Sequence, residues 1–400
     1  MKKDILIVAQ YTQAPGEHEN DRFKYLAQML IKKPDVDVEI VTMDFSHHNK
    51  RHRDISENQA CEFGYKMSFV HVTGYKKNVS IKRVISNHIM GKNLRKYLNK
   101  RKKPDVVYVA IPSLDAGKAA ADYCKDNNIK MIIDIQDIWP EAFKLALNIP
   151  VVSDIVFYPM KRKAEYIYLQ ADGIISVSDT YVNRALEVNH KDIPTKTVFL
   201  GTELSAFDKI EPVSKKESDC ITIVYVGTLG ASYDLISTIE AMAILKEKNK
   251  VPINFLVMGD GPDKEKFIEH ARKLDIRCEF TGRLPYSEMV ARLKSCDIAV
   301  NPIHENAPQS IINKHADYAA AGLPVVNTQQ CKEYIELLKE YNAGINCKDS
   351  SKEEISKAID ALIHDKQLRE TMSNGSRKLA EEKFDRCNTY IHIVNEILNI

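Results

Sequence analysis

The 400-residue sequence lacks several features that would place it in a specialised class of proteins. No run of uncharged apolar residues approaches the length of about eighteen that a membrane-spanning helix needs. The fifteen glycines and fifteen prolines follow no repeating spacing, which excludes collagen-like and low-complexity chains. The 57 Lys and Arg residues barely exceed the 55 Asp and Glu residues, so the net charge of +2 gives no reason to expect a nucleic-acid partner.

Cysteine use and the N-terminal sequence both indicate a cytoplasmic protein. The eight cysteines are scattered without a Cys-x-x-Cys pair, which is typical of reduced thiols and not of disulfides or a zinc site. The N-terminus has only a short apolar run, Ile5–Ala9, and no small-residue cleavage site follows it, which indicates a buried strand and not a signal peptide. His47, His48 and His52 lack a cysteine or carboxylate partner of known ligand geometry, so we expect no metal site.

Short apolar runs alternate with amphipathic segments over almost the whole chain. Continuous β-branched runs suit strands buried on both faces, and the helical periods between them suit the crossovers of a parallel sheet. In the first half the predicted strands are Ile5–Ala9, Val38–Thr42, Phe69–Val72, Val106–Ala110, Met131–Ile135, Gly173–Val177 and Val198–Leu200. In the second half they are Ile221–Val226, Ile253–Met258, Arg277–Thr281, Ile298–Asn301, Pro324–Val326 and Gly344–Asn346. We therefore predict an α/β protein with two doubly wound, Rossmann-like domains.

A polar seam separates the two halves. Residues 201–220 lack a sustained period, and a fresh unit of strand, glycine loop and helix begins directly after them. The pattern predicts a domain boundary here and a central cleft that both domains face. We assign residues 1–205 to the first domain and 206–382 to the second, and expect 383–400 to form a helix that packs back on the first domain.

The segment Asn301–Thr328 carries the sharpest chemical signal. It reads as a strand, a polar loop, a helix that begins near Ser310 and a further strand. Ser310 is a good N-cap, and the positive end of such a helix faces the sheet edge where ligands bind. Lys314 and Asp317 are three residues apart and share one face of this helix. A sugar nucleotide would suit this pair, with Lys314 on the diphosphate and Asp317 on the ribose hydroxyls.

Five further stretches of sequence can be compared with known families. They are VYVGTLG at 224–230, VMGDGPDKEKF at 257–267, FTGRLP at 280–285, NKHADYAAAGLPVV at 313–326 and DIQDIWPE at 134–141. Together they resemble the family 4 glycosyltransferases of the GT-B fold, and in particular capsule and O-antigen transferases that use UDP-N-acetylaminosugars. The resemblance implies that the first domain binds the acceptor and that the second binds the UDP-sugar.

The resemblance also implies roles for single residues. In the second domain Gly227 and Gly230 would let backbone amides approach the diphosphate, with Arg283 and Asn313 beside them. The family commonly has two Glu separated by seven residues, and the matching positions here are Gln309 and Asp317. In the first domain the family's glycine loop retains only Gly16, and Asn20 and Arg22 follow it at the start of a helix. The DIQDIWPE element would bring Gln136 and Asp137 to the reaction centre. Tight turns and helix caps are the structural alternatives for these residues.

The stretch Tyr75–Lys103 is strongly basic, with eleven Lys or Arg and no Asp or Glu. Ile81, Val84 and Ile85 fall at helical spacing within it, so it is either a membrane-docking helix or a crossover helix with a solvated charged face. Interleaved aromatics are sparse, which argues against nucleic acid. We expect a docking surface for anionic lipid, and a protein located in the cytoplasm or at the inner face of the plasma membrane.

These observations favour a retaining glycosyltransferase. It would transfer a sugar, an N-acetylated aminosugar by the resemblance, from a UDP-sugar to a polyprenyl-linked or other glycan acceptor in surface polysaccharide assembly. No metal cofactor is expected, because Lys314 and backbone amides would stabilise the leaving diphosphate. A UDP-N-acetylglucosamine 2-epimerase on the same fold and a non-catalytic partner subunit are the alternatives, the latter because glutamines stand at positions 136 and 309.

Overall fold

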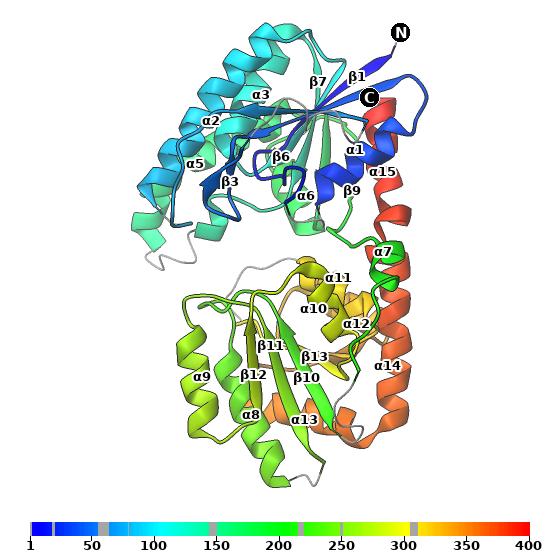
Figure 1. Ribbon diagram of the computed structural model, residues 1–400. Coiled ribbons are helices and arrows are strands. Elements are labelled where there is room, and N and C mark those ends of the chain that lie inside the picture. The colour runs from blue at the N-terminus through cyan, green and yellow to red at the C-terminus, as the bar shows by residue number, and fades with distance from the viewer. Residues whose placement is uncertain are drawn as a thin grey trace. The chain divides into compact units, whose positions relative to one another are not determined.

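The computed structural model of the protein describes residues 2–17, 21–54, 64–78, 80–143, 150–214, 220–248, 251–304 and 311–400 (Figure 1). Two compact units make up the chain. Unit 1 comprises Met1–Val198 together with Tyr390–Ile400, and unit 2 comprises Phe199–Thr389. The C-terminal residues therefore belong to the same unit as the N-terminal half of the chain.

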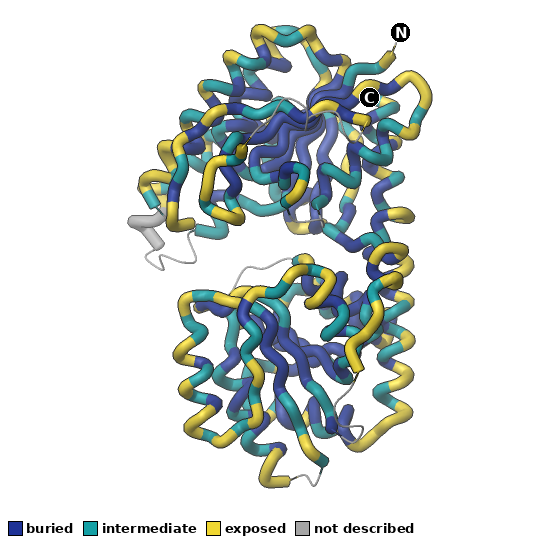
Figure 2. Tube along the Cα trace, in the orientation of Figure 1, coloured by how far each residue is buried: buried dark blue, intermediate teal, exposed yellow. Residues whose placement is uncertain are grey.

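Unit 1 is built on a parallel sheet of seven strands in the order β5-β2-β1-β6-β7-β8-β9. The strands are β1 Lys3–Val8, β2 Val36–Met43, β5 Lys66–Val70, β6 Val106–Ile111, β7 Lys130–Ile135, β8 Gly173–Ser176 and β9 Thr195–Thr197. A small antiparallel hairpin, β3 Phe45–Ser46 with β4 Arg51–His52, follows β2. Most strand residues are buried, as a parallel sheet covered on both faces requires (Figure 2).

Helices cover both faces of this sheet. They are α1 Arg22–Ile31, α2 Ile81–Lys100, α3 Leu114–Asn127, α5 Pro150–Gln170, α6 Asp179–Leu186 and the C-terminal part of α15 Arg386–Asn399. Helix α1 and the end of α15 share one core cluster, in which Phe23, Leu26, Tyr390 and Val394 are buried. Helix α3 packs against both α2 and α5.

Unit 2 repeats the architecture with a six-stranded parallel sheet in the order β12-β11-β10-β13-β14-β15. The strands are β10 Ile221–Val226, β11 Ile253–Met258, β12 Cys278–Gly282, β13 Ile298–Asn301, β14 Val325–Asn327 and β15 Gly344–Asn346. The helices are α7 Leu204–Asp208, α8 Leu235–Lys248, α9 Lys264–Lys273, α10 Tyr286–Leu293, α11 Asn313–Ala320, α12 Lys332–Glu340, α13 Lys352–His364, α14 Lys366–Leu379 and the π-helix η2 Ala380–Phe384.

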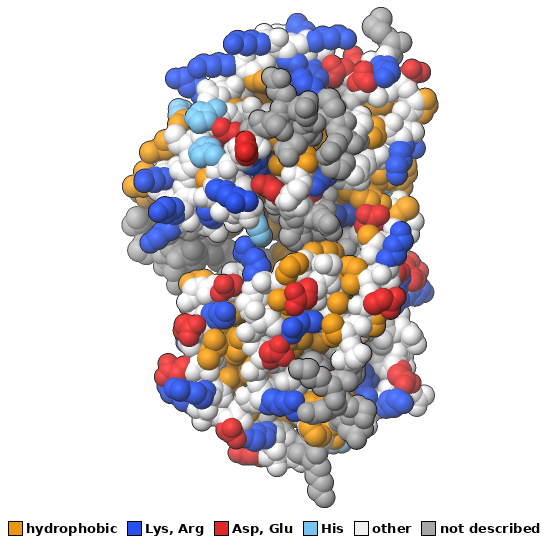
Figure 3. Space-filling view, in the orientation of Figure 1, with side chains coloured by type: hydrophobic (Ala, Val, Ile, Leu, Met, Phe, Trp, Pro, Cys, Tyr) orange, Lys and Arg blue, Asp and Glu red, His pale blue; other side chains and the backbone are white. Residues whose placement is uncertain are grey.

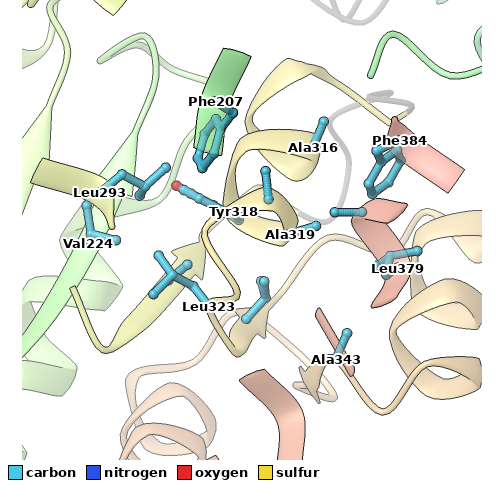
Figure 4. Packing of buried hydrophobic residues seen from close by; sticks show 14 of the residues in the cluster. Phe207, Val224, Leu293, Ala316, Tyr318, Ala319, Leu323, Ala343, Leu379 and Phe384 are labelled. Atoms are coloured by element: carbon cyan, nitrogen blue, oxygen red, sulfur yellow. The ribbon is translucent and has the colours of Figure 1, made fainter. Parts of the chain in front are cut away.

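Two core clusters lie in unit 2. One contains Leu235, Ile239, Phe255 and Ile359, so α8 and α13 pack with the central strands. The other gathers side chains of α7, α10, α11 and η2 around Tyr318 (Figure 4). Helix α11, the segment with the sharpest chemical signal, is therefore part of a rigid core.

The predicted α/β class with two doubly wound units is confirmed, and β10, β11, β13 and β15 have the predicted bounds. The strand predicted at Val198–Leu200 is wrong, because the last strand of unit 1 is β9, Thr195–Thr197. This short edge strand is largely exposed, so its sequence lacks the apolar run that marks a buried strand. The β3–β4 hairpin carries no apolar run either, and the sequence did not predict it.

Candidate functional site

Helix α11 is held at the C-terminal end of the unit 2 sheet by Tyr318. Its hydroxyl accepts a hydrogen bond from Val226 N at the end of β10 (2.8 Å) and donates one to Val300 O in β13 (3.2 Å). The helix begins at Asn313, with Ile312 in the N-cap position, and His315 Nδ1 accepts a hydrogen bond from Ile312 N. The helix thus begins later than the start expected near Ser310, and Ser310 itself lies outside the described residues.

Lys314 is a buried cation with no anionic partner among the described residues. Only 5% of it is exposed, and its Nζ has no hydrogen-bond partner. The Nζ lies 4.6 Å from the ring centre of Tyr225 and 4.3 Å from that of Tyr233, so two aromatic faces attract it. Burial lowers the pKa of Lys314 well below its ordinary value. A bound anion would supply the compensation that the protein itself does not.

Asp317 lies one turn further along α11 and contacts a different group. It is 5% exposed, and Tyr286 in α10 donates a hydrogen bond to its Oδ1 at 2.8 Å. The Tyr286 hydroxyl also lies 2.9 Å from Thr202 Oγ1. Burial raises the pKa of Asp317 to about 6. The two residues predicted to act together thus have separate surroundings, Lys314 beside the end of β10 and Asp317 beside α10.

The glycines of the turns after β10 and β11 fall into two groups. At Gly259 a Cβ atom would lie 1.8 Å from Gly227 O, and at Gly261 it would lie 2.1 Å from Leu229 O, so close packing of the two turns requires both glycines. Gly227 adopts a φ of 147°, which an L side chain rarely adopts. At Gly230, by contrast, a Cβ would meet nothing closer than 3.9 Å. Close contacts or backbone conformation therefore require glycine at positions 259, 261 and 227. Neither requires it at position 230, where the open space is available to a ligand.

The remaining residues predicted for unit 2 lie at its surface or outside the described residues. Asn313 is exposed at the first position of α11, and Arg283 is exposed directly after β12. Gln309 and Ser310 fall in the segment 305–310, outside the described residues.

In unit 1 the DIQDIWPE element begins with the last two residues of β7 and continues beyond the C-terminal edge of the sheet. The Asp137 carboxylate accepts a hydrogen bond from Trp139 Nε1 (3.0 Å), and burial raises the pKa of Asp137. Gln136 donates its backbone N–H to Ile111 O, and its Nε2 is buried without a partner. Gly16 has a φ of 77°, and no atom would meet its Cβ within 4 Å. A half-buried carboxyl next to an unused amide is suited to a hydroxyl-bearing ligand.

Arg22, which the sequence placed at a cleft or in solvent, has a structural role instead. It is 5% exposed, and its Nε donates to Asp134 Oδ2 at 2.7 Å. Its Nη1 donates to Val198 O and to the Tyr390 hydroxyl in α15. This buried ion pair ties the C-terminal helix to unit 1, while Asn20 lies outside the described residues.

Comparison with known proteins gives the unit 2 site its context. Residues 206–379 match the family model described as glycosyl transferases group 1. The match spans less than half of the chain, and the matched residues are called the group 1 domain below. The match covers Lys314, Asp317 and the glycine turns, and the resemblance to family 4 glycosyltransferases is confirmed.

Relatives of the group 1 domain are recognisable in sequence and in structure. An uncharacterized glycosyltransferase of Methanocaldococcus jannaschii is 26% identical over 56% of this chain and 58% of its own length. The Probable glycosyltransferase WbjE of Pseudomonas aeruginosa is 22% identical over 58% of this chain and 60% of its own. The chain therefore spans under two thirds of both curated relatives. The structure of Anabaena HepE in complex with UDP and glucose has a TM-score of 0.69 at 14% identity, covering all of both chains, which bears out the GT-B fold.

Sequence reasoning missed the tyrosines that contact Lys314 and Asp317 in the group 1 domain. Tyr225 lies in β10, Tyr233 in the turn after it and Tyr286 in α10, up to 89 residues from Lys314 in the printed sequence. Tyrosines near a glycine turn are a weak signal, and the pairing of β10 with β13, which are far apart in sequence, is what brings the end of β10 close to α11.

Two further findings concern metal and membrane. His71 Nδ1 lies 2.6 Å and His52 Nδ1 3.5 Å from the oxygens of Asp44, and the three ligand atoms lie within 4.8 Å of one another. Such a set could hold a divalent cation, although it is far in sequence from the group 1 domain. Among the described residues, no helix combines the length and apolar character that crossing a bilayer requires.

Proposed function

We propose that this protein is a retaining glycosyltransferase that transfers a sugar from a UDP-sugar to a glycan acceptor in surface polysaccharide assembly. The observation that carries the proposal is Lys314, a buried lysine of the group 1 domain for which the described residues supply no counter-ion. The Anabaena relative solved with UDP and glucose supports a UDP-sugar donor. The name of WbjE supports glycosyl transfer.

Lys314 would bind the diphosphate of the donor. Cleavage of the glycosyl–phosphate bond makes the sugar carbon cation-like and adds negative charge to the departing diphosphate. The ammonium of Lys314 and the backbone amides at Gly227 and Gly230 would stabilise that charge without a divalent metal. Asp317 would accept hydrogen bonds from the ribose, and Asn313 and Arg283 would line the donor from the surface.

Unit 1 would bind the acceptor. The DIQDIWPE element and the Asn313–Tyr318 segment resemble their counterparts in transferases of UDP-N-acetylaminosugars, so we propose an N-acetylated aminosugar as the transferred group. Asp137, whose pKa is raised by burial, would exchange a proton with an acceptor hydroxyl. Gln136 would orient that hydroxyl through its buried amide.

We further propose that α2 docks unit 1 on an anionic membrane, where a polyprenyl-linked acceptor would be found. Ile81, Val84 and Ile85 are 80%, 63% and 49% exposed, and Lys and Arg side chains gather over the same helix (Figure 3). The buried face of α2 is formed by other residues, such as Met90 and Leu94. An exposed apolar stripe flanked by cations is suited to interfacial lipid.

Product analysis tests the function. Purified protein incubated with UDP-N-acetylaminosugars and a lipid-linked glycan should release UDP and extend the acceptor with the same anomeric configuration as the donor. Conversion of the sugar nucleotide without acceptor would identify a 2-epimerase instead. Binding of UDP without turnover of any donor would identify a non-catalytic partner subunit.

Vesicle co-sedimentation tests the membrane surface. Binding should rise with anionic lipid and fall as salt is raised, because surface attraction is screened. Replacing Lys92, Lys96 and Lys100 by Gln should reduce it without changing UDP affinity, whereas Arg95 is spared because it pairs with Asp126. Equal sedimentation of the variant and the wild type would show that this face is merely solvated.

A further inference from the structure

Arg83, in the first turn of α2, is surrounded by aromatic rings. Its guanidinium carbon lies 5.2 Å from the ring centre of Trp139, 5.4 Å from that of Tyr11 and 6.0 Å from that of Tyr75. Its Nη atoms donate to Asn78 O at 2.9 Å and to the Tyr11 hydroxyl at 3.3 Å. Its Nε is buried and has no partner. Only neutral oxygens thus receive hydrogen bonds from this guanidinium.

The absence of a carboxylate sets Arg83 apart from its counterparts in unit 1. Other buried or half-buried arginines form ion pairs: Arg22 with Asp134, Arg53 with Glu17, Arg95 with Asp126, Arg101 with Glu39 and Arg184 with Glu141. Among the described residues, no carboxylate lies within ion-pair distance of Arg83. A half-buried guanidinium that keeps a free N–H is a preformed site for an anion with paired oxygens, such as a phosphoryl group.

The neighbouring groups add positive charge. Lys50 Nζ lies 5.0 Å from the centre of the Tyr75 ring, which Arg83 also contacts. His47 Nδ1 lies 2.5 Å from the Tyr75 hydroxyl, and burial with the charges of Lys50 and Arg83 lowers the pKa of His47 to about 3. The imidazole is therefore neutral at physiological pH. It can accept or donate a hydrogen bond without repelling the cations of Lys50 and Arg83.

The position of the cluster indicates what the anion belongs to. Tyr11 and Trp139 follow β1 and β7 at the ligand-binding edge of the sheet, and Trp139 donates to Asp137, the proposed acceptor contact. The same first turn of α2 exposes the apolar side chains of Ile81 and Val84. We infer that Arg83 binds a phosphoryl group of an isoprenoid diphosphate-linked acceptor, with the isoprenoid contacting Ile81 and Val84. The inference rests on the proposed function, since it names the acceptor's anchoring group.

Trp139 makes the inference directly testable, because it is the only tryptophan of the chain. Titration of the full-length protein with farnesyl diphosphate should change its tryptophan fluorescence in a saturable way. Farnesol, which lacks the anion, and inorganic pyrophosphate, which lacks the isoprenoid, should each bind at least about tenfold more weakly. Equal affinity for pyrophosphate and farnesyl diphosphate would overturn the lipid assignment and leave a site for free phosphate only.

A matched pair of variants assigns the effect to Arg83. Arg83→Gln should weaken farnesyl diphosphate binding at least about tenfold, the loss of one charge-assisted contact. Arg162→Gln, which removes an exposed arginine of the same unit, should not. Unchanged affinity in Arg83→Gln overturns the inference. If that variant melts early, Arg83→Lys replaces it, and it should bind weakly because it keeps the charge but loses the planar fork.

A separate measurement keeps this inference apart from the proposed function. UDP affinity, measured by calorimetry, should be the same in Arg83→Gln and the wild type, since Lys314 lies in the other unit. Failure of the wild type to bind UDP would refute the proposed function while leaving the farnesyl diphosphate result to be judged by itself. Loss of UDP binding in Arg83→Gln alone would refute the assignment of Arg83 to the acceptor.

Discussion

Replacement of Lys314 by Met should make the ligand-free protein more stable and the UDP complex weaker. Methionine keeps the unbranched shape of lysine and removes the charge that burial penalises. Its sulfur can still contact the rings of Tyr225 and Tyr233. If Lys314 served the packing of unit 2, the substitution would lower the stability and leave UDP affinity unchanged. This one substitution therefore distinguishes a binding residue from a structural one.

The magnitude follows from the two opposing contributions at this site. Removing an uncompensated buried charge should favour folding by about 2 to 4 kcal/mol, while the lost attraction to two aromatic faces opposes it by about 1 to 2 kcal/mol. A net gain of about 1 to 2 kcal/mol would raise the melting temperature of a unit of this size by about 2 to 8 °C. The lost phosphate contact should cost about 1.5 to 3 kcal/mol, which weakens UDP binding by about 10- to 150-fold.

The pH dependence has a defined sign. Because the pKa of Lys314 is lower in the folded protein than in the unfolded chain, the unfolded chain binds more protons between the two values, and wild-type stability rises with pH there. The penalty is full below the folded pKa and vanishes above about 10.4. The stability advantage of Lys314→Met should therefore shrink as pH is raised from 7 towards 10.

Thermal denaturation and titration calorimetry check these expectations side by side. Lys348→Met, which removes an exposed lysine of the same unit, serves as the control and should change neither measurement. A lower melting temperature in Lys314→Met, or UDP affinity equal to the wild type, would show that the buried ammonium belongs to the packing of unit 2. Proton uptake on UDP binding at alkaline pH would independently report that the diphosphate restores the charge of Lys314.

Three further predictions concern the same domain. Asp317→Asn should stabilise the protein by about 2 to 3 kcal/mol above pH 6, where the wild-type carboxyl is ionised against its raised pKa, and the gain should disappear below about pH 4 in a pH series of melting curves. Gly230→Ala should leave the melting temperature within about 2 °C of the wild-type value and weaken UDP binding. Gly259→Ala should instead fold poorly, because its Cβ would meet Gly227 O. Equal UDP affinity in Gly230→Ala and the wild type would show that no ligand approaches Gly230. Sugar transfer should survive EDTA, and loss of activity that Mg²⁺ or Mn²⁺ restores would contradict charge stabilisation by Lys314 alone.

Local patterns in the sequence determined the fold class and the positions of most strands. The runs Ile221–Val226 and Ile253–Met258 match β10 and β11 because strands buried on both faces need continuous apolar residues. The edge strand β9 escaped prediction because nothing buries it. The helix carrying Lys314 and Asp317 was also recognisable, since a polar loop precedes it and a further strand follows it.

Tertiary structure alone decided which charged residues are free to bind a ligand. Arg22 and Arg83 both lie in the first turn of a helix of unit 1, and no local pattern distinguishes them. Asp134 neutralises the first, whereas the groups that contact the second among the described residues are aromatic rings and neutral oxygens. Lys314 and Asp317 likewise share a helix but have different neighbours. Ion pairs join residues far apart in sequence, so the compensation of a buried charge depends on how strands and helices from distant segments are brought together.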